Sequence, residues 1–178
     1  MKFLLMVVVA FSGNDGLSTV APPITPDEEL YLKATELYES GNDSLAAEMF
    51  FKLAVNFPSS KRAQDAFYYA GTLFYKEKMF GPAASAFKIY AERFPDGRQL
   101  NEVLYWMGMC YFSIQEYQKA LEAFTEELDR FPNSEFRLDA MRLMAMCYIM
   151  LGETDRGNEI LRKVSEEVRE APEYWFRE

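Results

Sequence analysis

Apolar residues recur along most of this chain at the three- and four-residue spacing of amphipathic helices. Between positions 97 and 133, one such helix carries Leu104, Met107 and Tyr111, and a second carries Phe124. The second helix is expected to end at Phe131-Pro132, because the residue before a proline avoids helical geometry. The pattern therefore predicts two helices joined by a short turn at residues 115–116.

The sequence pattern of this helix pair occurs four times along the chain. Phe57, Phe94 and Phe131 each precede a proline, and they are spaced by 37 residues. A shift of 37 also aligns columns of similar size, which are Ala34/Gly71/Gly108/Ala145, Leu37/Phe74/Tyr111/Tyr148, Ala46/Ala83/Ala120/Gly157 and Phe50/Phe87/Phe124/Leu161. Repetition of this kind indicates a stacked array, and we predict units at about 26–59, 60–96, 97–133 and 134–170. The Gly or Ala column would let the second helix of each unit pack closely on the first.

The two ends of the chain differ from the repeats. Lys2 is followed by an apolar run over 3–11, which is much shorter than the ~20 residues of a membrane-spanning helix but fits the core of a secretory signal peptide. We therefore predict a signal peptide, or an apolar segment that begins a buried strand or helix, over 1–21, and a linker over 22–25. Residues 171–178 form an aromatic tail, which either folds back onto the last helix or docks on a partner or a neighbouring copy.

One motif connects the repeats with a known family. Leu104-x2-Met107-Gly108-x2-Tyr111, followed by Ala120-x3-Phe124 and Pro132, resembles the tetratricopeptide repeat (TPR), with Leu104 at the usual tryptophan position. The resemblance covers about residues 26–170. It implies an all-α fold, a TPR-like α-solenoid of four helix-turn-helix repeats.

The 37-residue period, the Phe-Pro step and the apolar start narrow the resemblance. They are similar to the periplasmic BamD-like outer-membrane assembly lipoproteins and to the YbgF-like coordinators of the Tol-Pal system. Asn14 follows Phe11-Ser12-Gly13 where the BamD-like proteins carry a lipid-modified cysteine, those proteins usually have five repeats, and the YbgF-like proteins usually have an N-terminal coiled coil. The resemblance implies an exported, periplasmic or outer-membrane-associated protein of envelope assembly; a Tol-Pal-type coordinator and a cytoplasmic TPR scaffold are the alternatives.

Composition excludes several classes of function. The 178 residues carry a net charge of −9, no histidine and two cysteines, Cys110 and Cys147. Histidine-based catalysis and histidine metal sites are therefore absent, and an acidic chain is a poor surface for nucleic acid. The cysteines occupy the same position in neighbouring units, and packed helices lie ~8–10 Å apart, too far for a disulfide. We predict a protein that is not an enzyme and has no cofactor, metal ion or small-molecule substrate.

Partner binding is expected on the concave side of the array, which the first helices of such repeats line. One column there is aromatic until its last member, and a second column and an intervening position add further apolar side chains. An acidic column lies one turn earlier. The predicted partner-binding residues are Tyr31, Tyr68, Tyr105 and Arg142, then Tyr38, Tyr75, Phe112 and Met109, and the acids Glu28, Asp65, Glu102 and Asp139.

Both sets have a structural alternative. The aromatic side chains could pack between adjacent first helices, and the acids could serve the positive ends of their own helices. If the columns are exposed, the partner is a basic, neutral or apolar protein or peptide, because among the column members only Arg142 is basic. Replacing Tyr68 and Tyr105 by alanine is then expected to weaken partner capture and leave the fold intact.

Overall fold

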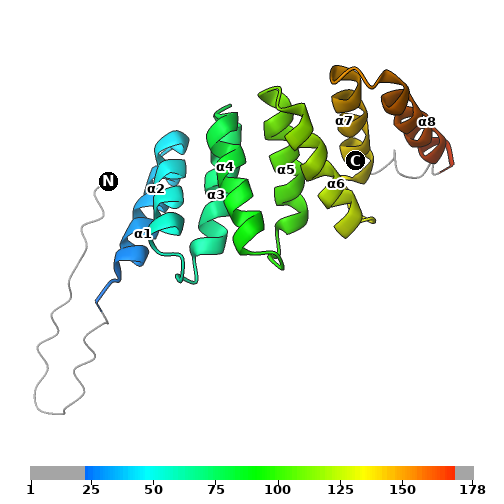
Figure 1. The fold of residues 1–178 in the computed structure, drawn as a ribbon. Coiled ribbons are helices and arrows are strands. Elements are labelled where there is room, and N and C mark those ends of the chain that lie inside the picture. Colours follow the sequence, from blue (N-terminus) through cyan, green and yellow to red (C-terminus); the bar gives the residue numbers. More distant parts are fainter. Residues whose placement is uncertain (1–22, 171–178) are drawn as a thin grey trace, which may run out of the picture.

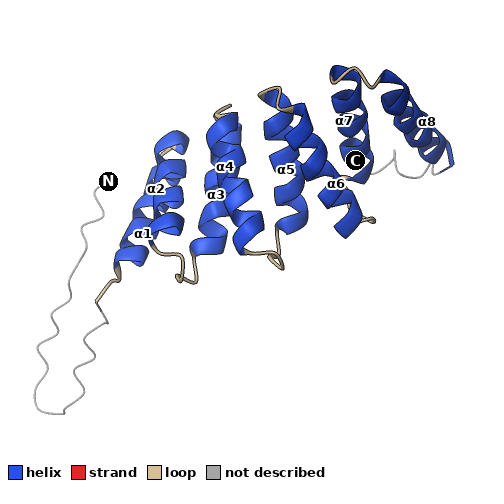
Figure 2. Ribbon diagram, viewed as in Figure 1, coloured by secondary structure: helices blue, strands red, loops and turns tan. Residues whose placement is uncertain are grey.

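The computed structural model describes residues 23–170, which form eight α-helices and no strand within that range (Figures 1 and 2). The predicted N-terminal segment 1–21 and the predicted tail 171–178 lie outside the described residues. Of the predicted linker 22–25, the structure describes residues 23–25. The helices are α1 Pro26–Glu39, α2 Asp43–Asn56, α3 Ala63–Lys76, α4 Phe80–Arg93, α5 Leu100–Ser113, α6 Tyr117–Arg130, α7 Arg137–Met150 and α8 Thr154–Glu170.

The helices form four antiparallel pairs that stack side by side in one row, with α1–α2 at one end and α7–α8 at the other (Figure 1). Each helix packs mainly on the helices next to it in the sequence, as expected of a solenoid. Helices α1 to α7 have 14 residues each, and α8 has 17. The prediction of an all-α solenoid of TPR-like repeats is confirmed.

The turn inside every pair has one residue in the left-handed region of backbone space. These residues share one column, Gly41, Lys78, Gln115 and Gly152, with φ of 78°, 59°, 64° and 86°. After each of them the chain closes back onto the first helix, for example through the hydrogen bond from the Met79 amide to the Phe74 carbonyl at 2.8 Å. The 37-residue period therefore includes the turn geometry as well as the helices.

Lys78 holds this conformation without being a glycine, and so it carries strain. Glycine at position 78 should raise the free energy of unfolding by about 0.5 kcal/mol, because the left-handed conformation costs about 1 kcal/mol for other residues and the greater freedom of the unfolded chain offsets part of the gain. The matched control is Lys88→Gly at an exposed position within α4, which should lose about 1 kcal/mol. Urea denaturation of both variants measures the difference, and equal losses would contradict the strain at Lys78.

The small column brings the two helices of a pair together as the sequence predicts. A Cβ atom added to Gly71 would lie 2.4 Å from the Phe87 ring, and one added to Gly108 would lie 2.5 Å from the Phe124 ring. Both rings are fully buried. In the α3–α4 and α5–α6 pairs, a phenylalanine ring of the second helix therefore occupies the space that a side chain at the glycine of the first helix would need.

The buried side chains form two clusters along the row. One extends from Ala34 in α1 to Ala123 in α6, and the second extends from Tyr105 in α5 to Cys147 in α7. Cys110 and Cys147 are buried and unpaired, and burial raises the pKa of their thiols to about 12 and about 11. Both therefore serve as small apolar core residues.

Candidate functional site

The acidic column at the starts of the first helices is engaged in internal contacts. The Glu28 carboxylate accepts two hydrogen bonds from the Arg62 guanidinium, at 2.8 and 2.9 Å. Asp65 pairs with Arg98 at 3.4 Å. Because each acid lies in one pair and each arginine in the turn that leads to the next pair, these contacts join neighbouring repeats.

The other two acids have partners within their own helices, and Glu102 also contacts Tyr68 in α3. The Trp106 indole donates to Glu102 at 3.4 Å, and Arg142 pairs with Asp139 at 2.7 Å. Tyr68, which is half-buried, has a raised pKa because of burial and because of a hydrogen bond to Glu102. The four carboxylates thus have roles in the array itself, and the charge that they offer a partner is partly neutralised.

The tyrosine column is largely covered by the repeat that follows. The Arg62 guanidinium lies 3.8 Å from the centre of the Tyr31 ring. Tyr105 is 8% exposed and stacks on Phe136 at 4.5 Å with an interplanar angle of 15°. Burial also raises the pKa of Tyr105.

These positions change the expected effect of replacing Tyr68 and Tyr105 together. Tyr105 belongs to the second core cluster, so its loss would open a cavity in the core. The expectation that this double variant leaves the fold intact is therefore wrong for Tyr105. The sequence placed Tyr105 on the correct helix but could not show that Phe136 would cover its ring.

The second predicted column is more open at its start. Tyr38 is 52% exposed. Tyr75 is half-buried and its ring contacts Trp106 and Phe80, with centroids 4.8 and 5.5 Å away. Phe112 contacts Tyr117 at 5.6 Å, and Met109 is half-buried against the second cluster.

An exposed apolar set on the first helices lies outside the predicted partner-binding residues. Leu32, Tyr69, Met146 and Met150 are 50%, 41%, 46% and 57% exposed, and Trp106 and Leu143 are half-buried. The missed signal was the column one residue after the tyrosines, which reads Leu32, Tyr69, Trp106 and Leu143. We use the name first-helix band for Leu32, Tyr38, Tyr69, Trp106, Met109, Leu143, Met146 and Met150, which come from α1, α3, α5 and α7.

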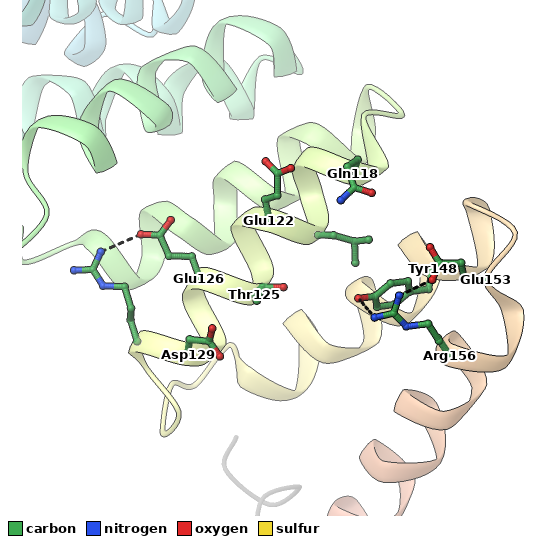
Figure 3. A pocket seen from close by; sticks show the side chains of 10 residues that line it. Gln118, Glu122, Thr125, Glu126, Asp129, Tyr148, Glu153 and Arg156 are labelled. Atoms are coloured by element: carbon green, nitrogen blue, oxygen red, sulfur yellow. Dashed lines mark hydrogen bonds and ion pairs between the residues drawn. The ribbon is translucent and has the colours of Figure 1, made fainter.

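A hollow of about 650 Å³ lies between α6 and the α7–α8 turn (Figure 3). Most of its lining residues carry polar or charged groups. Its two arginines are paired internally, Arg130 with Glu126 at 3.0 Å and Arg156 with Glu153 at 2.6 Å. The ten lining residues are Gln118, Leu121, Glu122, Thr125, Glu126, Asp129, Arg130, Tyr148, Glu153 and Arg156. None of the predicted partner-binding residues lines this hollow.

A buried carboxylate belongs neither to the first-helix band nor to the hollow. Glu127 in α6 is 0% exposed, and neither of its side-chain oxygens has a hydrogen-bond partner within ordinary distance. Burial raises its pKa, an effect that nearby Ser134 and Arg137 oppose. The equivalent residues Leu53, Tyr90 and Val164 are all buried, so Glu127 occupies a core column.

Two further features bear on the kind of protein. Within residues 23–170, no helix has the length and apolar character needed to cross a membrane. The same part of the chain holds no cluster of three or more acids or cysteines arranged to bind a metal ion. What the described residues do offer is the apolar first-helix band and a hollow between α6 and the α7–α8 turn.

Residues 23–155 match the model of the YfiO family, described as outer membrane lipoprotein. The chain belongs to this family. The match covers most of the described helices and agrees with the BamD-like resemblance in the repeats. No curated protein sequence matches the chain.

Several solved structures share the fold at low sequence identity. MamA from Desulfovibrio magneticus RS-1, from residue 41 to its end, has a TM-score of 0.61 at 19% identity, with 81% of this chain and 76% of that chain covered. Another crystal structure of MamA gives 0.63 at 19%, covering 86% and 84%. TPR-like repeats of a putative kinesin light chain from Podosopora anserina give 0.62 at 11%, covering 84% and 80%. These similarities support the TPR architecture.

Proposed function

We propose that this YfiO-family protein is a non-enzymatic scaffold that holds protein or peptide partners of the cell envelope against its first-helix band. The observation that carries the proposal is the band itself, which places exposed apolar side chains on α1, α3 and α7 and half-buried ones on α5 between them. Exposed apolar side chains spread over successive repeats are typical of a protein-binding face. The family description supports an exported protein acting at the outer membrane.

The chemistry of the band suggests the kind of partner. Leucine, methionine and aromatic side chains adapt to apolar surfaces, and Tyr38 and Tyr69 add hydroxyl groups that can bind a peptide backbone. Among the nearby acids, Glu28 and Asp65 are neutralised by inter-repeat ion pairs. The net charge of −9 of the whole chain still disfavours acidic partners. We therefore propose apolar, neutral or basic partners, and we restrict the earlier site to the exposed Tyr38 and the half-buried Met109, together with the rest of the band.

Serine at Leu32 and Met146 should weaken partner capture by at least tenfold, because each apolar side chain contributes ~1–2 kcal/mol when a partner buries it. The measurement is crosslinking followed by a pull-down from the native envelope, with the recovered proteins quantified. The matched control is Leu45→Ser on α2, since Leu45 is also 50% exposed but lies outside the band. Circular dichroism checks that all variants are folded.

The identity of the recovered proteins separates the functions. Recovery of outer-membrane assembly proteins that falls with Leu32→Ser and Met146→Ser, and does not fall with Leu45→Ser, supports the proposal. Recovery of Tol-Pal proteins would favour the coordinator function, and recovery of cytoplasmic proteins alone would contradict the envelope location. Equal losses in the band variants and in the control would exclude the band as the binding face.

A further inference from the structure

The methionines of the described chain differ sharply in exposure. Within residues 23–170, Met146 and Met150 are the methionines with exposed side chains, at 46% and 57%, and both lie in α7. The other methionines of this range are buried or half-buried, namely Met49, Met79, Met107, Met109, Met141 and Met144. Two neighbouring thioethers are therefore open to small reagents in solution.

These two side chains lie on one face of α7. Residues four positions apart are neighbours on a helix surface, and the half-buried Leu143 continues the same face one turn earlier. All three residues belong to the first-helix band, and α7 stands in the last pair of the row (Figure 1). The exposed thioethers thus form one end of the surface to which we assign partner binding.

The helix pair does not need methionine at either position. The column of Met146 begins with Thr35 and Thr72, whose hydroxyls each donate to a carbonyl of their own helix, at 2.9 and 3.0 Å. The column of Met150 is polar in the three earlier pairs, where it reads Glu39, Lys76 and Ser113. Polar groups are therefore compatible with the fold at both positions, and a chemical change that makes these two methionines polar should leave the array folded.

The less exposed methionines have specific protection. The Met79 sulfur accepts a hydrogen bond from Ser44 at 3.6 Å, and the Met144 sulfur accepts one from Thr125 at 3.7 Å. Such a bond engages the sulfur lone pair that an oxidant must reach. Met107 is 8% exposed within the first core cluster, so an oxidant reaches it only when the core opens locally.

We propose that Met146 and Met150 are a modification site for peroxide, and that their oxidation switches off partner binding by the first-helix band. Each thioether sulfur attacks one oxygen of hydrogen peroxide, and the O–O bond breaks as the S–O bond of the sulfoxide forms. The second oxygen leaves as water after proton transfer, so that the sulfur loses two electrons and the peroxide gains them. The product is a polar side chain in place of an apolar one.

The consequence for binding rests on the proposed function of the band. In the free protein, water solvates the sulfoxide oxygens of side chains as exposed as these. A partner that covers α7 removes this water and offers apolar groups in its place, and burying a polar group without a hydrogen bond is costly. Oxidation at both positions should therefore weaken capture by at least about tenfold.

The rate of oxidation in the purified full chain tests the site itself. In dilute hydrogen peroxide, Met146 and Met150 should form sulfoxide at least about tenfold faster than Met107, because Met107 reacts only in locally opened molecules. Mass spectrometry of the digested chain measures the three rates, and circular dichroism checks that the oxidised protein is folded. In concentrated urea the rates should become equal. Equal rates in the folded chain would overturn the assignment of the site.

Retention on a phenyl column reports the change of surface without any partner. Peroxide should reduce the retention of the wild-type chain, because its exposed apolar surface becomes smaller. The double variant Met146→Leu, Met150→Leu has no thioether at these positions and should lose most of this shift. An equal shift in the variant and the wild type would assign the effect to other residues and overturn the proposal.

Capture of envelope proteins, after the peroxide has been removed, tests the effect on binding. The wild type should lose at least about tenfold of its capture, and the double variant less than about twofold, each compared with its own untreated level. Equal losses, or undiminished capture by the oxidised wild type, would overturn the switch. Absence of capture by the untreated wild type would instead contradict the proposed function, whereas the oxidation rates and the column retention do not depend on it.

Discussion

Alanine in place of Gly71 is expected to lower the free energy of unfolding by about 1–3 kcal/mol, although alanine is the better helix former. The new Cβ would lie 2.4 Å from the Phe87 ring, and that ring is fully buried and has no room to move. The control is Gly81→Ala in α4, where an added Cβ meets nothing within 4 Å. This change should be neutral or stabilise the protein by up to about 1 kcal/mol.

The terminal pairs suggest how the loss at Gly71 could be rescued. In the aligned columns Ala34 corresponds to Phe50, which retains 4% exposure, and Ala145 corresponds to Leu161, which is half-buried. A first-helix alanine thus occurs where the opposite side chain is smaller or less enclosed. Phe87→Leu in the Gly71→Ala background should therefore recover part of the lost stability, and urea denaturation of the single and double variants measures it. Equal stabilities of Gly71→Ala and Gly81→Ala would contradict the close packing.

Replacing Glu127 by glutamine is expected to stabilise the protein at pH 7 by about 1–2 kcal/mol, because burial makes the ionised carboxylate costly and Ser134 and Arg137 offset only part of that cost. Glutamine keeps the shape and removes the charge. The control Glu126→Gln changes the neighbouring, half-exposed residue and its ion pair with Arg130, and it should alter stability by less than about 0.5 kcal/mol.

The pH dependence gives this prediction a direction. Burial raises the pKa of Glu127 above its ordinary value of 4.5, so the folded state binds this proton more tightly than the unfolded state. The contribution of Glu127 to stability is then greatest below pH 4.5 and is lost as the pH rises through the raised value. The advantage of Glu127→Gln should disappear in acid. An advantage that persists undiminished at pH 4 would mean that the charge of Glu127 is not its cause.

The sequence predicted the fold because the fold is periodic. Aligned Gly and Phe columns, such as Gly71 with Phe87, fix which faces meet within a pair, and the Phe-Pro steps fix where each pair ends. The left-handed turn column contains Lys78 and Gln115, which no turn rule favours, and it became recognisable only through the positions of Gly41 and Gly152.

The candidate site was less predictable, because exposure depends on what the next repeat places over a residue. Tyr31 and Tyr105 share a column, but Arg62 covers one and Phe136 covers the other. Adjacent helix positions differ by ~100° in direction, so the neighbouring column with Leu32 and Tyr69 remained open when the tyrosine column was closed. The burial of Glu127 could have been predicted from the sequence, because the 37-residue shift aligns it with the apolar residues Leu53 and Val164.

The arrangement of the ion pairs has a mechanical consequence. Glu28–Arg62 and Asp65–Arg98 each join a pair to the next, so that pulling on the two ends of the row loads all of these joints in series. A chain of links under tension yields at its weakest member, and the joint between α6 and α7 has the least extensive packing of the neighbouring helices and encloses Glu127. Under force, the α7–α8 hairpin should therefore detach first, and the remaining three pairs should continue to bear the load as one spring.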